Sequence, residues 1–183
     1  MKRRNFIKGA SAAVLATGAP VVSAGSDLRG TAGSGETFDP NQWKTIEAVQ
    51  DHLLPSETDA PGGREANATA YLDLTLADPG FDPDVRGFIL KGIGWLNEIA
   101  EERERRPFHL VEPVRREDLL RQIAGSGAGE RWLSTLVTYT LEALLADPLY
   151  GGNPNGIGWT WLEHDPGRPR PTPNKIYGRL GKT

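Results

Sequence analysis

Cysteine is absent from all 183 residues of this chain, which removes several kinds of chemistry at once. Without it there can be no disulfide, no thiolate-bound metal, no iron–sulfur cluster and no covalently attached c-type haem. Histidine is scarce as well: His52, His109 and His164 stand alone, without the spacing that places two metal ligands on one helix face. We therefore expect no metal site in this chain.

Motifs for nucleotide binding and for nucleophilic catalysis are also missing. Glycine pairs occur at short spacing, but none follows a predicted strand or completes the dinucleotide-binding fingerprint. Gly125-Ser126-Gly127 lacks both the Gly-x-Ser-x-Gly frame and the strand of a nucleophile elbow. We expect no flavin, nicotinamide or haem bound by this chain alone, and no catalytic residue.

The first 24 residues have the pattern of an export signal. Two adjacent arginines precede a phenylalanine, a lysine and an apolar run of 13 residues, and the segment ends in Val-Ser-Ala, which signal peptidase accepts. The alternative is an N-terminal membrane helix, but 13 residues interrupted by glycine and proline cannot span a ~30 Å hydrocarbon layer. The residues assigned to this twin-arginine signal are Arg3, Arg4, Phe6, Lys8 and Ala24.

Export by the twin-arginine translocase predicts a periplasmic protein that crosses the membrane already folded. Four of the 21 basic residues lie in residues 1–24, so the mature chain has 17 basic and 24 acidic residues and a net charge of −7. This charge disfavours nucleic acid as a partner. Residues 25–37 are rich in glycine, serine and threonine and are predicted to form a flexible leader.

Residues 38–183 are predicted to form one mainly α-helical domain, a small helical bundle with long irregular loops. Apolar residues recur at helical spacing, Asp-Pro pairs supply a helix cap and a first-turn proline, and no long alternating strand pattern occurs. The chain from Leu149 onwards is expected to be irregular, with an extended arm at 163–183. The helices are expected near 40–54, 71–76, 83–106, 113–123 and 132–144, with the charged run 101–106 as the solvated last turn of the third.

Glycines within and between these helices carry separate predictions. Gly92 and Gly94 lower helix propensity by roughly 1 kcal/mol each, so we expect them to allow close approach of another backbone. The glycine-rich stretch 125–129 is expected to break the chain between two helices.

Residues 147–162 (DPLYGGNPNGIGWTWL) combine turn formers with large aromatic residues. Two interpretations stay open: a loop that seals the core with its own aromatics, or an aromatic platform presented to a partner. Spacing favours Trp159 as a core residue, because Gly158 allows close packing. It favours Tyr150 and Trp161 as partner contacts, because they adjoin the basic arm.

The arm itself is basic and proline-rich, which suits a segment lying along another protein's surface; a solvated tail is the alternative. Beyond Asp165 it contains five basic residues and no acidic one. The candidate partner-binding residues are Tyr150, Asn153, Trp161, Arg168 and Arg170.

The chain resembles the gluconate 2-dehydrogenase subunit 3 family. The resemblance rests on the twin-arginine leader, on residues 38–55, and above all on the run 147–153 followed by Gly-Trp at 158–159. The sequence departs from the family pattern at 61–64, and residues 161–167 resemble one branch of the family more than its average.

The resemblance implies a non-catalytic accessory subunit of a periplasmic oxidoreductase complex. In this family the catalytic subunit is a GMC-type (glucose–methanol–choline) flavoprotein that holds FAD, and a cytochrome c subunit with haem c often takes the electrons. The small subunit supplies the export signal and assists the maturation and stability of the flavoprotein.

Two other classes of function stay open at this point. One is a free-standing periplasmic enzyme, such as a hydrolase that uses the carboxylates of Glu98 and Glu102 at helical spacing. The other is a binding module that stacks a sugar on Trp159 or Trp161.

Overall fold

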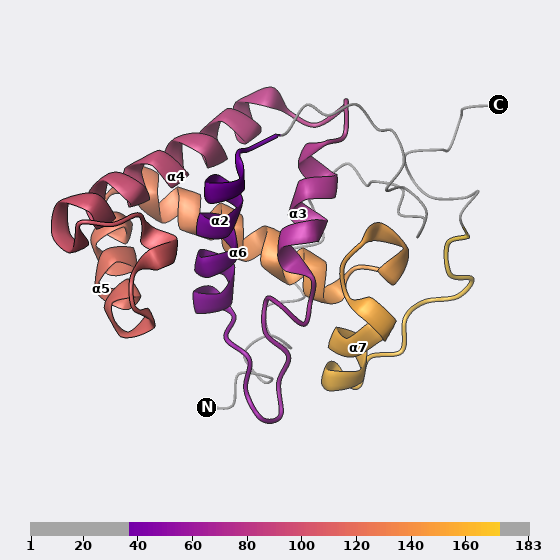
Figure 1. Ribbon diagram of the computed structural model, residues 1–183. Coiled ribbons are helices and arrows are strands. Elements are labelled where there is room, and N and C mark those ends of the chain that lie inside the picture. The colour runs from indigo at the N-terminus through magenta and orange to yellow at the C-terminus, as the bar shows by residue number, and fades with distance from the viewer. Residues whose placement is uncertain (1–36, 173–183) are drawn as a thin grey trace.

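Six α-helices and three short 3-10 turns make up residues 37–172, the part of the chain that the computed structural model describes (Figure 1). No β-strand occurs within these residues, so the prediction of a mainly α-helical domain is confirmed. Residues 1–36 and 173–183, which include the predicted signal and the end of the arm, lie outside the described part. The elements are α2 (Pro40–Leu53), α3 (Ala68–Leu76), α4 (Pro83–Glu104), η1 (Phe108–Leu110), α5 (Pro113–Ala124), α6 (Gly127–Leu145), η2 (Pro148–Tyr150), η3 (Pro154–Gly156) and α7 (Ile157–Leu162).

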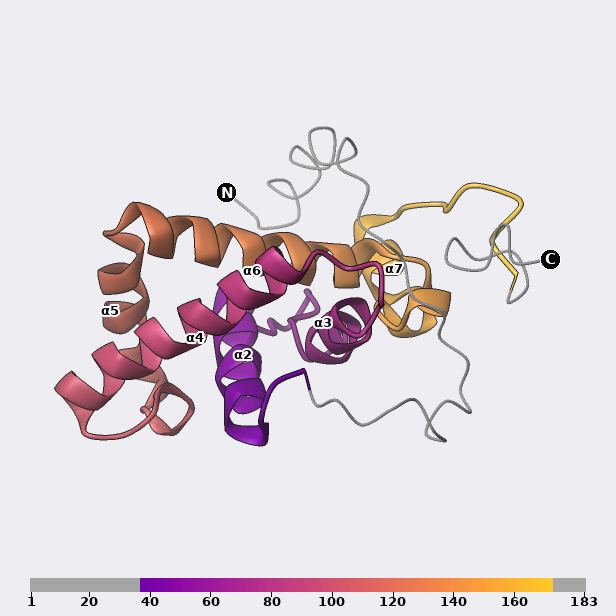
Figure 2. The same cartoon turned by 90° about the horizontal axis from the view of Figure 1, so that it is seen from above.

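The central helix is α6, which packs against each of the other α-helices in the described part of the chain. Seen from above, α6 runs along one side of the molecule, α4 approaches it at an angle, and α5 joins the two (Figure 2). Helices α2 and α3 pack against each other and against α6, and α7 lies beside the C-terminal end of α6 (Figure 1). Between residues 37 and 172, no helix is both long enough and apolar enough to cross a membrane.

The helices begin where the sequence places its capping residues. The Asp39 carboxylate accepts hydrogen bonds from the backbone amides of Asn41 and Gln42, and the Gln42 side chain accepts one from the Asp39 amide, which completes a capping box. Asp82 caps α4 through the amide of Asp84 at 2.8 Å. The two Asp-Pro pairs therefore start α2 and α4 as predicted.

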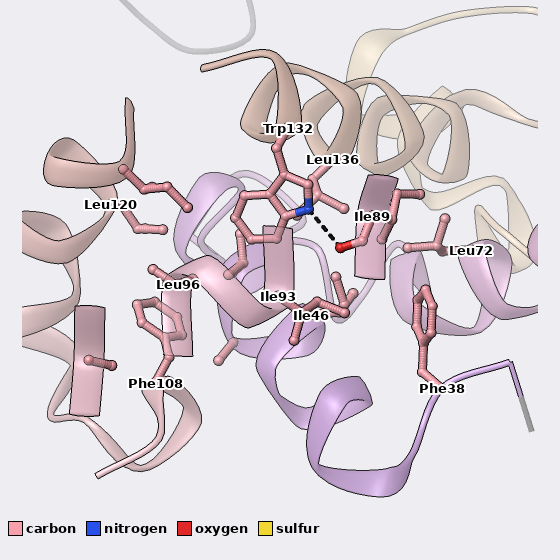
Figure 3. Close-up of a cluster of buried hydrophobic side chains, with 14 of the residues drawn as sticks. Phe38, Ile46, Leu72, Ile89, Ile93, Leu96, Phe108, Leu120, Trp132 and Leu136 are labelled. Atoms are coloured by element: carbon pink, nitrogen blue, oxygen red, sulfur yellow. Dashed lines mark hydrogen bonds between the residues drawn. The ribbon is translucent and has the colours of Figure 1, made fainter. Parts of the chain in front are cut away.

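Trp132 is the largest fully buried side chain, and the main core is built around it (Figure 3). Its indole Nε1 donates a hydrogen bond of 3.1 Å to the backbone oxygen of Ile89, so the polar edge of the ring is satisfied inside the core. The other buried members of this cluster are Phe38, Ile46, Ala48, Val49, Leu72, Leu76, Phe81, Ile89, Ile93, Leu96, Ala100, Phe108, Val111, Leu119, Leu120, Ile123 and Leu136.

Gly92 and Gly94 of α4 differ from the prediction and from each other. A Cβ on Gly92 would lie 2.2 Å from the indole of Trp132, so the close neighbour is a side chain and not another backbone. A Cβ on Gly94 would meet no atom within 4 Å. Only Gly92 is required by packing, because a flat ring lies directly on the helix at that position.

The interruption between α5 and α6 is shorter than the stretch 125–129 that was predicted. Helix α6 already begins at Gly127, because the Ser126 hydroxyl accepts a hydrogen bond from the Gly129 amide and caps the helix. Gly129 lies inside the first turn, where a Cβ would be 2.0 Å from the oxygen of Ile123. The stretch therefore forms a tight corner between α5 and α6.

The region after Leu149 is more ordered than the irregular stretch predicted. It contains η3 and the six-residue helix α7, in which Trp159 and Leu162 are buried. So short a helix is not stable alone, and its packing against α6 supplies what its glycine-rich sequence lacks.

Candidate partner-binding surface

Residues 147–162 wrap around the C-terminal end of α6 and satisfy its free carbonyl groups. The last carbonyls of a helix have no partner within the helix and must find donors elsewhere. Trp159 Nε1 donates to the oxygen of Leu145 at 2.8 Å, and Asn153 Nδ2 donates to the oxygen of Ala146 at 2.9 Å. The aromatic run is thus an extended C-terminal cap for α6.

Two glycines let this run lie directly against α6. A Cβ on Gly152 would be 2.4 Å from the oxygen of Ala143, and a Cβ on Gly158 would be 1.9 Å from the oxygen of Leu144. Neither distance is possible for a real side chain, so only glycine allows the backbones to approach this closely. The glycines of the run therefore have structural reasons for being there.

Asn153 holds the run together from inside and is fully buried. Its backbone amide donates to the oxygen of Ala66 at 3.0 Å, and its side-chain oxygen accepts from the amide of Gly158 at 2.7 Å. With its side-chain nitrogen on Ala146, both polar ends of the amide are used within the chain. The prediction that Asn153 contacts a partner does not fit this geometry, because the side chain has no exposed area to offer.

Tyr150 and Trp161, the other aromatic candidates, are both half-buried. Tyr150 packs against a small cluster formed by Ala68, Tyr71 and Ala143. Trp161 packs against a second cluster, whose buried members are Leu54, Ala66, Leu144 and Leu162. Each ring therefore has one part against the protein and another part at the surface.

Arg170 folds back onto the aromatic run, whereas Arg168 does not. The Arg170 guanidinium donates hydrogen bonds of 2.9 and 3.1 Å to the two carboxylate oxygens of Asp147, and it lies 5.0 Å above the Trp159 ring. Burial alone would raise the pKa of Asp147, but the bonds from Arg170 and from the Leu149 amide outweigh it and hold this pKa below its usual value. Arg168 is exposed and pairs with no group among residues 37–172.

A half-buried carboxylate that sequence reasoning missed lies between α3 and α6. Glu142 of α6 accepts a hydrogen bond of 3.3 Å from the Tyr71 hydroxyl of α3, and burial raises the pKa of Glu142 despite that bond. Burial and the nearby Glu142 charge raise the pKa of Tyr139 to about 12. The sequence signal was available, since no lysine or arginine occurs between Arg131 and Arg168 to neutralise Glu142.

The residues considered for catalysis or metal binding are not gathered into a site. Glu98 and Glu102 are exposed on α4, as expected of ordinary surface charges. His52 lies 2.6 Å from Glu117, while burial and the cations Lys44 and Arg116 lower the pKa of His109. Residues 37–172 contain no group of three side chains placed to hold a metal ion.

Replacing Trp159 with alanine is predicted to destabilise the isolated chain by roughly 3 to 5 kcal/mol, because the ring is 8 % exposed and its nitrogen caps α6. The same change at Tyr150 or Trp161 is expected to affect partner affinity more than stability. Thermal melting and partner titration of the three variants test this. Unchanged affinity in all three would make the run a structural cap alone.

The comparison with known families gives one match. A family model described as gluconate 2-dehydrogenase subunit 3 matches residues 40–167, which extend from the start of α2 past the end of α7. It covers the helical domain and the aromatic run and leaves out the N-terminal leader. Searches of curated proteins and of solved structures returned no match.

Proposed function

The chain belongs to the gluconate 2-dehydrogenase subunit 3 family, and we propose that it is the accessory small subunit of a periplasmic flavoprotein dehydrogenase complex. The family places it in a multisubunit dehydrogenase. Our proposal is more specific: the catalytic partner is a GMC-type flavoprotein that holds FAD, and a cytochrome c subunit with haem c accepts the electrons. This chain binds no cofactor and does no chemistry of its own.

The family match over the whole helical domain carries this proposal. The arrangement of the aromatic run supports it, since the polar groups of Asn153, Trp159 and Asp147 are used to cap helices and anchor the arm. These groups therefore stabilise the conformation of the run. A rigid, shaped surface is what a subunit offers to another subunit.

The N-terminal sequence supplies the second part of the proposal, which is export. A flavoprotein that folds around FAD in the cytoplasm cannot be threaded unfolded through the general secretory pore. A twin-arginine signal on a bound small subunit would carry both proteins across together. We propose that Arg3 and Arg4 direct the complex to the translocase, and that the subunit then stays attached and stabilises the flavoprotein.

Replacing Arg3 and Arg4 together with lysine is expected to leave both the chain and its flavoprotein partner in the cytoplasm. Fractionation of cells that express both proteins, followed by flavin fluorescence and immunoblotting of each fraction, measures the effect. Replacing Arg105 and Arg106 together with lysine is the matched control, because it makes the same chemical change at another adjacent pair of exposed arginines. A flavoprotein that still reaches the periplasm in the double variant contradicts the proposed role in export.

A further inference from the structure

Glu142 is an acidic side chain that the fold buries halfway without a positive partner among the residues that the structure describes. Its one hydrogen bond within residues 37–172 comes from a neutral donor, the Tyr71 hydroxyl, and no ion pair there includes it. A carboxylate held away from water loses hydration that a tyrosine restores only in part. Its raised pKa has this physical cause. The isolated chain is therefore less stable with this charge than without it.

The two stretches of chain that carry Tyr71 and Glu142 are acidic in sequence. Residues 65–85, which include α3, contain five acidic residues and no lysine or arginine. Residues 132–167, from the first turns of α6 to beyond α7, contain four acidic residues and no lysine or arginine. Of these four, Asp147 is matched by Arg170. Arg86 of α4 reaches the end of α3, where it donates a hydrogen bond to the oxygen of Leu76, but no ion pair between residues 37 and 172 joins it to Glu142. A cationic group from a partner would complement this carboxylate.

Two tyrosines lie near the carboxylate, and a third packs against the same small cluster. Tyr71 donates to Glu142, and Tyr139 and Tyr150 pack against the cluster that Tyr71 forms with Ala68 and Ala143. Tyr139 and Tyr150 remain half-exposed, and so does Glu142. Tyrosine contributes large contact areas at protein interfaces, and its ring face attracts cations. A guanidinium group can bind a carboxylate and stack on an aromatic ring at once, which an ammonium group does less well.

We propose that the tyrosine seam, defined as Tyr71, Tyr139, Glu142 and Tyr150 between α3, α6 and η2, is a docking surface for the partner subunit. An arginine of the partner enters the seam and pairs with Glu142. The identity of the partner as the dehydrogenase flavoprotein rests on the function proposed above. The seam itself rests on the position and burial of Glu142 and on the lack of a counter-charge for it within residues 37–172.

The test compares Glu142→Gln with Glu98→Gln in the mature chain. Glutamine has the same shape, keeps an acceptor for Tyr71 and removes the charge, while Glu98 is an exposed glutamate of α4. Titration of each variant against the purified flavoprotein measures affinity, and thermal melting of the free chain measures stability. We expect Glu142→Gln to weaken binding at least tenfold and to melt at the same temperature as the wild type or higher. Glu98→Gln should change neither.

Lowering the pH supplies a second readout. Because the pKa of Glu142 is raised in the free fold, the carboxylate takes up a proton earlier than an ordinary glutamate as the pH falls. Binding by the wild-type chain should weaken over that pH range, and binding by Glu142→Gln should change less. Tyr71 and Tyr139 also face Glu142, but both stay protonated there because their pKa values are raised.

Each other outcome overturns a distinct part of the proposal. Equal affinity of wild type and Glu142→Gln means that the flavoprotein docks elsewhere, whereas failure of the wild type to bind any flavoprotein contradicts the proposed function. If removing residues 173–183, which contain Lys175, Arg179 and Lys182, abolishes the difference between the two chains, the cation comes from this chain's own tail. Self-association that Glu142→Gln abolishes would make the occupant a second copy.

Discussion

Replacing Gly158 with alanine is expected to destabilise the folded chain by about 3 kcal/mol, although the change adds one methyl group. The new Cβ would lie 1.9 Å from the oxygen of Leu144 and 3.0 Å from its carbonyl carbon. These are backbone atoms of α6, which cannot rotate away as a flexible side chain can. Helix α7 would have to move off α6, and the hydrogen bond from Trp159 to Leu145 would be lost with it.

Gly94→Ala is the matched control for this prediction and should have the opposite sign. Gly94 also lies within a helix, but a Cβ there meets no atom within 4 Å. Alanine should therefore stabilise α4 by roughly 1 kcal/mol through helix propensity alone. Urea denaturation of both variants gives the free energies of unfolding. Similar free energies of unfolding for the two variants would show that the close contact with Leu144 does not restrict the residue at position 158.

The helices of this fold could largely be predicted from the sequence because their signals are local. Asp39 and Asp82 each precede a proline, and the apolar residues that follow recur with the helical period. Helix α7 gave no such signal, because Gly156 directly precedes it, Gly158 lies inside it, and glycine disfavours helices. Its stability comes from α6, a contact that no local pattern reveals.

Sequence reasoning could locate unusual glycines but not what lies against them. Gly92 and Gly94 look equivalent in the sequence, yet one faces the indole of Trp132 and the other faces open space. Tertiary packing alone makes this distinction. The same limit applies within the run 147–162, where Gly152 and Gly158 lie against backbone atoms of α6, whereas Gly151 lies against the side chain of Leu74.

Part of the candidate surface could be predicted from the sequence, and part of it depends on contacts between distant residues. The aromatic run was identified by its composition, and Trp159 is buried as its spacing indicated. The role of Asn153 depends on the carbonyl of Ala146, and the anchoring of Arg170 depends on Asp147, 23 residues before it. The environment of Glu142 depends on Tyr71, which lies on another helix. Interactions over such separations require the fold to be known.

Trp132→Ala is the substitution expected to damage the main core most. The side chain is fully buried, and its removal leaves a cavity between α4 and α6 and abolishes the hydrogen bond to the oxygen of Ile89 (Figure 3). The expected loss is about 3 to 5 kcal/mol, which is a large share of the stability of a typical domain. Urea denaturation of the variant measures it.

Gly92→Ala should reveal whether the ring is responsible for that glycine. In the wild-type chain the added Cβ would lie 2.2 Å from the indole, and we expect a loss of about 2 to 3 kcal/mol. In the Trp132→Ala background the obstructing ring is gone, so the same substitution should become neutral or stabilising. The two losses are then strongly non-additive. Gly94→Ala in both backgrounds should give equal changes, and additive losses for Gly92 and Trp132 would show that another group restricts Gly92.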